Sequence, residues 1–165
     1  MGITVFPLYN PTAQAYINYS KLGRGIGHEI AHGFDTTGVK YDAQGNDQDW
    51  VSLEDRETFD LKTKCFVDQY SGYELLPGKW VNGSLTLGEN IADNLGLHLA
   101  YQTYKRLVQD GQVEQPKLLG LEKLNPEQLF FLSFASVSSA KITQLLNVQN
   151  FVSFILIRFR NNETS

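Results

Sequence analysis

The sequence predicts a mainly α-helical fold, because its clearest patterns are helical periodicity and helix caps. Apolar residues recur every four positions in one segment, which is the spacing of a single helix face: Leu87, Ile91, Leu95 and Leu99. Ser52 with Asp55, and Asn125 with Gln128, have the spacing of capping boxes at the starts of two further helices. The 165 residues suffice for one domain or part of one.

The first predicted helix is rich in glycine. Residues 1–19 carry Pro, Tyr and Asn and are expected to be irregular, and a helix is expected over residues 20–34. Gly23, Gly25 and Gly27 fall in its early turns, where each costs roughly 1 kcal/mol relative to Ala. Either another backbone packs very close to this helix, or the helix starts later than residue 20.

Loops and a second helix follow. Residues 35–49 are expected to form a loop because they are rich in Gly, Asn and Asp. A helix is expected over residues 53–70, and its apolar face would comprise Phe59, Cys65, Phe66 and Tyr70. Two turn dipeptides, Pro77-Gly78 and Asn82-Gly83, predict a loop over residues 75–84.

The strongest helical pattern begins at Thr86 and is expected to end at Asp110-Gly111. A polar linker then leads to Asn125, the expected cap of a last helix with Pro126 in its first turn. The apolar residues that this helix is expected to bury are Leu129, Phe130, Leu132, Phe134 and Val137.

Composition excludes several functional classes. Fourteen Lys and Arg against 18 Asp and Glu give a net charge of -4, and the basic residues are scattered, so nucleic-acid binding has no electrostatic support. A single cysteine, Cys65, excludes an internal disulfide and a Cys-rich zinc finger. The chain begins without a secretory signal, so its start looks internal, and the apolar stretch 142–160 has too many polar interruptions for a transmembrane helix.

Residues 28–32 read His-Glu-Ile-Ala-His, an HExxH motif within the first predicted helix. Positions four apart lie on one helix face, so His28 and His32 can converge on one metal ion with Glu29 close by. The alternative is a pair of surface histidines on a solvated helix face. A catalytic zinc site needs a third protein ligand and an open position for water.

The third ligand is sought on the strongest helix. A third histidine in the pattern HExxHxxGxxH is excluded, because Asp35 and Gly38 stand at the required Gly and His positions. Glu89 and Asp93 lie four apart on one face, so Glu89 can bind the metal while Asp93 orients a ligand histidine. Glu89 also completes a capping box with Thr86, and a cap would explain Glu89 without explaining Asp93.

Over residues 9–137 the chain resembles the neprilysin and endothelin-converting enzyme family of zinc endopeptidases. The matching stretches are Tyr9–Thr12, Ala15–Tyr19, Gly25–Ile30, His32–Asp35, Leu87–Asp93 and Pro126–Leu132. The resemblance implies one zinc ion per chain, bound by His28, His32 and Glu89. It also implies Glu29 as the catalytic base and Asp93 as an orienting carboxylate, often also assigned as a proton donor, with Asp35 as a further acid behind the ligands.

The same resemblance implies a fold and an activity. The expected fold is a thermolysin-like (zincin) catalytic subdomain, incomplete, with an active-site helix and a third-ligand helix. The expected function is a zinc metalloendopeptidase that hydrolyses small peptides by zinc-activated water. Family members are often membrane-anchored ectodomains, so an extracellular or cell-surface location is expected. Three glycosylation sequons are compatible with it, at Asn18, Asn82 and Asn162.

The chain departs from the family pattern after Val137. We expect residues 1–137 to form a partial peptidase region and 138–165 a divergent tail, because the family's Trp-Cys pair, substrate-binding arginine and oxyanion histidine do not follow Val137. Cys65 matches a family cysteine that pairs near the C-terminus and is expected to be unpaired here. The alternative function is therefore an inactive, truncated zinc-binding fragment that acts only by association with a longer relative.

Overall fold

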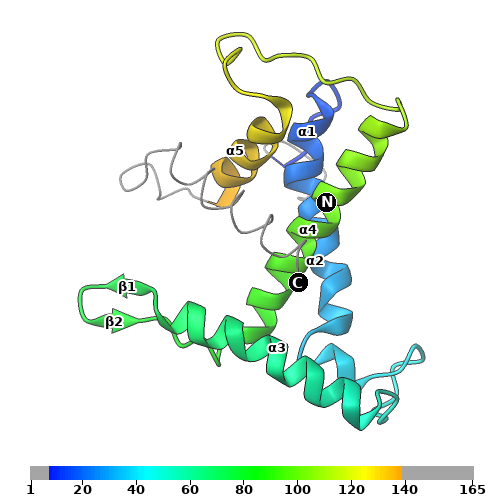
Figure 1. Ribbon diagram of the computed structural model, residues 1–165, viewed down its shortest axis with the longest axis vertical. Helices are drawn as coiled ribbons and strands as arrows, with labels where there is room; N and C mark the ends of the chain where they lie inside the picture. Colours follow the sequence, from blue (N-terminus) through cyan, green and yellow to red (C-terminus); the bar gives the residue numbers. More distant parts are fainter. Residues whose placement is uncertain (1–7, 139–165) are drawn as a thin grey trace. The chain divides into compact units, whose positions relative to one another are not determined.

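The computed structural model describes residues 8–138 and is mainly helical, as the sequence predicts. Figure 1 shows its elements in chain order. They are α1 (Ala15–Asn18), the π-helix η1 (Tyr19–Gly23), α2 (Arg24–Ala31), the 3₁₀ helices η2 (His32–Phe34) and η3 (Gly38–Lys40), α3 (Leu53–Ser71), strands β1 (Glu74–Leu76) and β2 (Lys79–Trp80), α4 (Leu87–Gln109) and α5 (Pro126–Ser138). No helix among residues 8–138 is both long and apolar enough to cross a bilayer.

The chain divides into two compact units. One consists of Gly25–Leu99, and the other of the chain on either side of that segment. Helix α4 contributes its first half to the former and its second half to the latter.

The glycine-rich helical segment is longer than the sequence indicated. Helical structure begins at Ala15 and continues through a π turn to Phe34, so the prediction of an irregular segment up to residue 19 is wrong. Among its glycines, Gly27 explains the close packing: a Cβ there would lie 2.7 Å from the carbonyl oxygen of Gly96. A Cβ at Gly25 would meet nothing within 4 Å.

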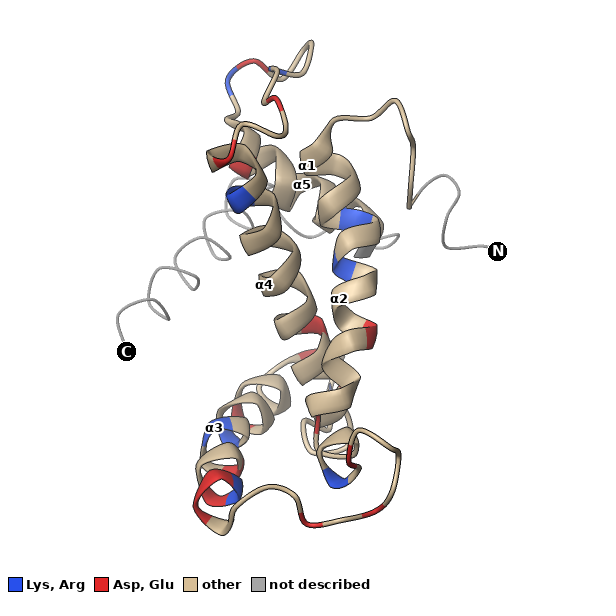
Figure 2. Cartoon of the chain, turned by 90° about the vertical axis from the view of Figure 1, so that its right-hand side faces the viewer, with Lys and Arg blue, Asp and Glu red and all other residues tan. Residues whose placement is uncertain are grey.

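In the unit Gly25–Leu99, helices α2 and α4 lie side by side (Figures 1 and 2). The contact is backbone to backbone, because a Cβ at Gly96 would lie 2.4 Å from the amide nitrogen of His28. Two glycines facing each other therefore let these helices approach more closely than any side chain would allow.

Helix α3 is capped as predicted but is largely exposed. The Ser52 hydroxyl accepts a hydrogen bond from the Asp55 amide at 3.1 Å. Figure 2 shows charged residues gathered at one end of this helix. Thr63 is its one buried residue within the described chain, whereas Cys65 is free and exposed, so the expected place of Cys65 on a buried face is wrong.

The expected loop at residues 75–84 contains a small hairpin. Strands β1 and β2 pair antiparallel, with Glu74 opposite Trp80, and Gly78 in the turn has a positive φ of 73°. On α4, Leu95 and Leu99 are about two-fifths exposed, while Ile91, Ala92 and Leu97 are buried. The buried stripe therefore lies to one side of the predicted leucine face.

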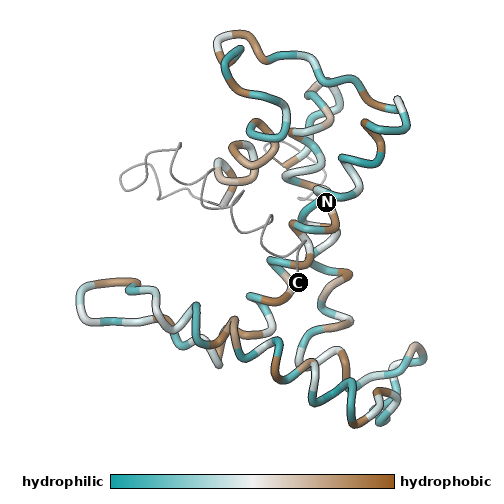
Figure 3. The backbone as a smooth tube through the Cα atoms, in the orientation of Figure 1, coloured by the Kyte–Doolittle hydropathy of each residue, from teal (hydrophilic) through white to brown (hydrophobic). Residues whose placement is uncertain are grey.

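The other unit has an aromatic core. The predicted capping box is present at the start of helix α5. The Asn125 side chain accepts a hydrogen bond from the Gln128 amide at 2.8 Å, and the Gln128 side chain accepts one from the Asn125 amide at 2.9 Å. Figure 3 shows the apolar character of this helix. Its side chains pack with those of α1 and the second half of α4, and the largest buried ones are Tyr16, Tyr104, Leu129, Phe130 and Phe131.

Candidate metal centre

The two histidines of the HExxH motif project from the same side of the segment formed by α2 and η2. Because they are four residues apart, their rings lie one helical turn from each other, with centroids 4.6 Å apart. Glu89 and Asp93 lie in the first turns of α4, which the Gly27–Gly96 contact brings against α2. The predicted ligands His28, His32 and Glu89 therefore lie together.

The spacing of the ligand atoms suits a zinc ion. The Nε2 atoms of His28 and His32 are 3.0 Å apart, and Oε2 of Glu89 lies 3.4 Å and 3.8 Å from them, respectively. Ligands about 2.0–2.1 Å from a tetrahedral zinc ion are separated by roughly 3.3 Å. The three observed distances scatter around that value.

Carboxylates on the far sides of the rings assign the tautomers of both histidines. Nδ1 of His28 lies 2.8 Å from Oδ1 of Asp93, and Nδ1 of His32 lies 2.7 Å from Oδ2 of Asp35. Because a carboxylate only accepts, each Nδ1 carries a proton and donates it, which in a neutral imidazole leaves the lone pair on Nε2. Two such nitrogens and a carboxylate oxygen that point at one another need a cation among them, either a proton or a metal ion, so this donor set fits a metal ion.

Asp35 is held firmly behind His32. It is buried, and its Oδ1 accepts hydrogen bonds from the amides of Thr37 and Gly38, each at 2.7 Å. Burial acts to raise the pKa of the Asp35 carboxyl, but the hydrogen bonds from Gly38, His32 and Thr37 outweigh it, so the pKa is lowered. The hydrogen bond to Asp35 in turn raises the pKa of His32 against the opposing effect of desolvation.

Glu29 is placed differently from the ligands. It is exposed on α2 beside His28 and does not belong to the cluster of three ligand atoms. The Glu29 side chain is therefore accessible to solvent, and its charge contributes to the raised pKa of His32.

Sequence reasoning missed the importance of Gly96. Without the backbone approach at Gly27 and Gly96, the predicted ligands on the two helical segments would lie farther apart. A glycine in the middle of the strongest predicted helix was the available signal, since glycine there weakens a helix and often marks close packing.

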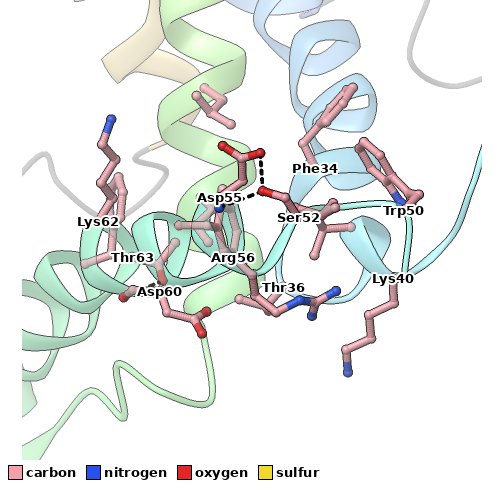
Figure 4. Close-up of a pocket in the computed structure, with 16 residues that line it drawn as sticks. Phe34, Thr36, Lys40, Trp50, Ser52, Asp55, Arg56, Asp60, Lys62 and Thr63 are labelled. Carbon is pink, nitrogen blue, oxygen red and sulfur yellow. Dashed lines mark hydrogen bonds between the residues drawn. The ribbon is translucent and has the colours of Figure 1, made fainter. Parts of the chain in front are cut away.

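A separate cavity of about 700 Å³ lies between α3 and the segment that follows α2. Its apolar lining includes Phe34, Trp50, Phe59, Phe66, Ile91 and Leu95. In Figure 4, Phe34 and Trp50 lie on one side, the α3 side chains line the other, and Lys40 and Lys62 point outward. The predicted metal ligands His28, His32 and Glu89 do not line this cavity.

Comparison with known proteins identifies the family. The model of peptidase family M13 matches residues 1–154. This chain belongs to peptidase family M13. This match confirms the resemblance to neprilysin-type zinc peptidases. A solved zinc metalloprotease has the same fold over most of this chain.

Curated M13 relatives are similar over most of this chain. Neprilysin-11 of Caenorhabditis elegans is 43% identical over 135 residues, which are 81% of this chain and 16% of that protein. The endothelin-converting enzyme homolog of Locusta migratoria is 44% identical over 149 residues, which are 90% of this chain and 20% of that protein. The M13 chain thus spans about a fifth of the length of the curated relatives it matches.

Solved structures support the same assignment. The Mycobacterium tuberculosis zinc metalloprotease ZMP1, in complex with an inhibitor, matches 82% of this chain and 21% of its own, with 37% identity and a TM-score of 0.72. A structure described as a Haemonchus galactose-containing glycoprotein complex matches 87% of this chain and 22% of its own, with 36% identity and a TM-score of 0.78. The prediction of a mainly helical, incomplete zincin subdomain is confirmed by these matches.

Proposed function

We propose that this M13 chain carries the metal-binding and catalytic groups of a zinc metalloendopeptidase that hydrolyses small peptides. The observation that carries the proposal is the convergence of Nε2 of His28, Nε2 of His32 and Oε2 of Glu89, with both Nδ1 atoms bonded to carboxylates. One zinc ion per chain would be held by these three atoms. The hydrogen bonds at Nδ1 argue against the alternative of two histidines on a solvated face.

The residues around the ligands have distinct tasks. A zinc ion held by these three atoms would lower the pKa of a water molecule and polarise a peptide carbonyl. Glu29, exposed beside His28, would accept a proton from the attacking water and return it to the leaving amine. Asp93 and Asp35 hold the imidazoles in the tautomer that presents Nε2, as carboxylates behind metal-binding histidines generally do.

Peptide hydrolysis by the chain and by Glu29→Gln tests the catalytic role. We expect zinc affinity to be retained, because Glu29 is not a ligand, and hydrolysis to fall roughly 100- to 10,000-fold, because the base is lost. Equal rates for the two proteins would contradict the assignment of Glu29.

Zinc titration of Glu89→Ala tests the ligand set. Binding should weaken strongly, because one of three protein donors is removed. Glu54→Ala is the matched control, since Glu54 is an exposed acid in the first turn of α3 and lies outside the cluster. Equal zinc affinity of Glu89→Ala and the unchanged chain would favour histidines on a solvated face.

A second candidate function is an inactive zinc-binding fragment that acts only through association with a longer relative. This chain spans 16% to 20% of the length of the curated relatives named above, so hydrolysis by the chain itself is the observation that separates the two candidates. Zinc binding that depends on Glu89, together with no hydrolysis that depends on Glu29, would support this candidate over the peptidase.

We also place this chain in an extracellular or cell-surface protein. The sequons at Asn18, Asn82 and Asn162 are compatible with passage through the secretory pathway. A structural neighbour described as a galactose-containing glycoprotein supports the same location. Detection of an epitope-tagged parent protein on intact, unpermeabilised cells tests it.

A further inference from the structure

We propose that Asn82 is an acceptor of an N-linked glycan and that Asn18 is not, although both lie in sequons. The proposal rests on the extracellular location given above and is independent of peptidase activity. It follows from the different environments of the two acceptor amides.

Asn82 is available for modification. Asn82 and Ser84 are both exposed, in the turn that precedes α4. Oδ1 of Asn82 accepts a hydrogen bond from the Leu85 amide at 3.0 Å, whereas Nδ2, the atom that takes the sugar, has no hydrogen-bond partner among the described residues. A glycan on Nδ2 therefore leaves the Asn82–Leu85 hydrogen bond in place.

The side chain of Asn18 makes hydrogen bonds within the fold. Its Nδ2 donates to the carbonyl oxygen of Asn10 at 2.8 Å, and its Oδ1 accepts from the Asn10 amide at 3.1 Å. This pair of hydrogen bonds clamps the segment around Asn10 against the first helical turns. Nδ2 also donates to the carbonyl oxygen of Ala13 at 3.5 Å, so a sugar that replaces either hydrogen of Nδ2 removes one of these hydrogen bonds from the folded chain.

The hydroxyl of the Asn18 sequon is also occupied. Ser20 is fully buried, and its Oγ donates to the carbonyl oxygen of Ile17 at 3.0 Å. The hydroxyl of Ser84, by contrast, is exposed. A sequon needs both its amide and the hydroxyl two residues later, and of the two sequons within residues 8–138 the one at Asn82 offers both in the folded chain.

The reaction is a group transfer without redox change. A lipid-pyrophosphate-linked oligosaccharide is the donor. Nδ2 of Asn82 forms a bond to C1 of the first sugar, the bond from C1 to the pyrophosphate oxygen breaks, Nδ2 loses one proton, and the lipid pyrophosphate leaves. The modified nitrogen keeps one hydrogen.

The test uses the whole chain behind a cleavable secretory leader in cultured animal cells, with Asn162→Gln removing the third sequon. Chain from the medium and from the soluble lumenal fraction is deglycosylated by peptide N-glycosidase in water labelled with heavy oxygen, which converts each glycosylated Asn to labelled Asp. A parallel sample kept in the same water without the enzyme gives the label from spontaneous deamidation, to which Asn82-Gly83 is prone, and this background is subtracted. Peptide mass spectrometry then gives the occupancy of each site. We expect occupancy at Asn82 to exceed that at Asn18 by at least roughly tenfold.

Matched variants at the hydroxyl position sharpen the test without altering Asn82. Ser84→Ala should abolish the label at Asn82, and Ser84→Thr should keep it, because only the latter preserves the sequon. Equal occupancy at Asn18 and Asn82, no label at Asn82, or a label that survives Ser84→Ala would each overturn the proposal. Zinc binding and peptide hydrolysis are measured on unglycosylated chain from bacteria, so failure of the proposed function is recognised separately.

Discussion

The two units of this chain are built differently. The unit around α1 and α5 buries large aromatic side chains and stacks Tyr104 on Phe130 with ring centroids 5.7 Å apart. The unit Gly25–Leu99, which holds the predicted metal ligands His28, His32 and Glu89, buries mainly small or polar residues such as Ala31, Asp35 and Ala92. Stability in the first unit therefore comes chiefly from apolar burial, and geometry in the second comes from backbone contact and hydrogen bonds.

Exposed apolar residues show the same contrast. Among residues 8–138, most of the large hydrophobic side chains that remain exposed belong to the unit Gly25–Leu99, including Ile26, Ile30, Phe34, Trp50 and Trp80. Apolar area left exposed contributes nothing to folding. The unit that carries the site is thus the less self-sufficient of the two, and mutations in the two units should separate stability from metal binding.

The largest expected effect lies in the aromatic core. Phe130→Ala should lower the free energy of unfolding by roughly 3–5 kcal/mol, because Phe130 is fully buried among three aromatic rings and its removal leaves a cavity. Chemical denaturation measures this loss. Leu119→Ala is the control, since Leu119 is 94% exposed and should change stability little. Similar losses for both variants would contradict the proposed role of this core.

The next effect lies at the contact between α2 and α4. Gly96→Ala should destabilise the unit Gly25–Leu99 by about 1–3 kcal/mol and weaken zinc binding, because its Cβ would collide with the backbone at His28 and push the helices apart. Gly25→Ala is the matched control. Its Cβ meets nothing, so it should stabilise the helix by up to about 1 kcal/mol and leave zinc affinity unchanged. Unchanged zinc affinity in Gly96→Ala would show that this contact does not position the ligands.

The parts of the structure that the sequence predicted depend on short-range patterns. Each capping box needs only residues three apart, and the common face of His28 and His32 follows from helical spacing alone. Glu89 and Asp93 could be singled out because a catalytic metal requires a third ligand and the next strong helix offered two acids on one face.

Other parts of the structure could not be predicted from the sequence, because they depend on contacts between residues far apart in the chain or have no local sequence signature. The contact of Gly27 with Gly96 joins residues far apart in the chain, and neither glycine indicates its partner. Helix α1 starts after Gln14, which makes no side-chain cap hydrogen bond, so its beginning has no local signature. Helix α3 lacks a clear apolar stripe, and the burial of Thr63 in place of Cys65 could not be read from it.

A smaller effect concerns the acids behind the histidines. Asp35→Asn should weaken zinc binding by about 10- to 100-fold, because the amide no longer favours the imidazole tautomer that presents Nε2 of His32. Asp42→Asn is the matched control, since Asp42 also accepts amide hydrogen bonds in a turn but contacts neither histidine. Zinc titration compares the two variants. Equal affinity in both would remove Asp35 from the site.

The smallest effect concerns a single hydroxyl in the aromatic unit. The Tyr104 hydroxyl is buried without a hydrogen-bond partner among the described residues, and burial raises its pKa to about 12. Because the folded chain holds this proton more tightly than the unfolded chain, the group leaves stability independent of pH below its unfolded pKa of about 10, and stability falls as the pH rises from 10 towards 12. Tyr104→Phe should therefore leave stability near pH 7 within about 1 kcal/mol of the unchanged chain, because no hydrogen bond is lost.

Between pH 10 and 12 the unchanged chain should lose more stability than Tyr104→Phe, as measured by urea unfolding at each pH. Parallel losses in the two proteins would show that this hydroxyl ionises as freely in the folded chain as in the unfolded one.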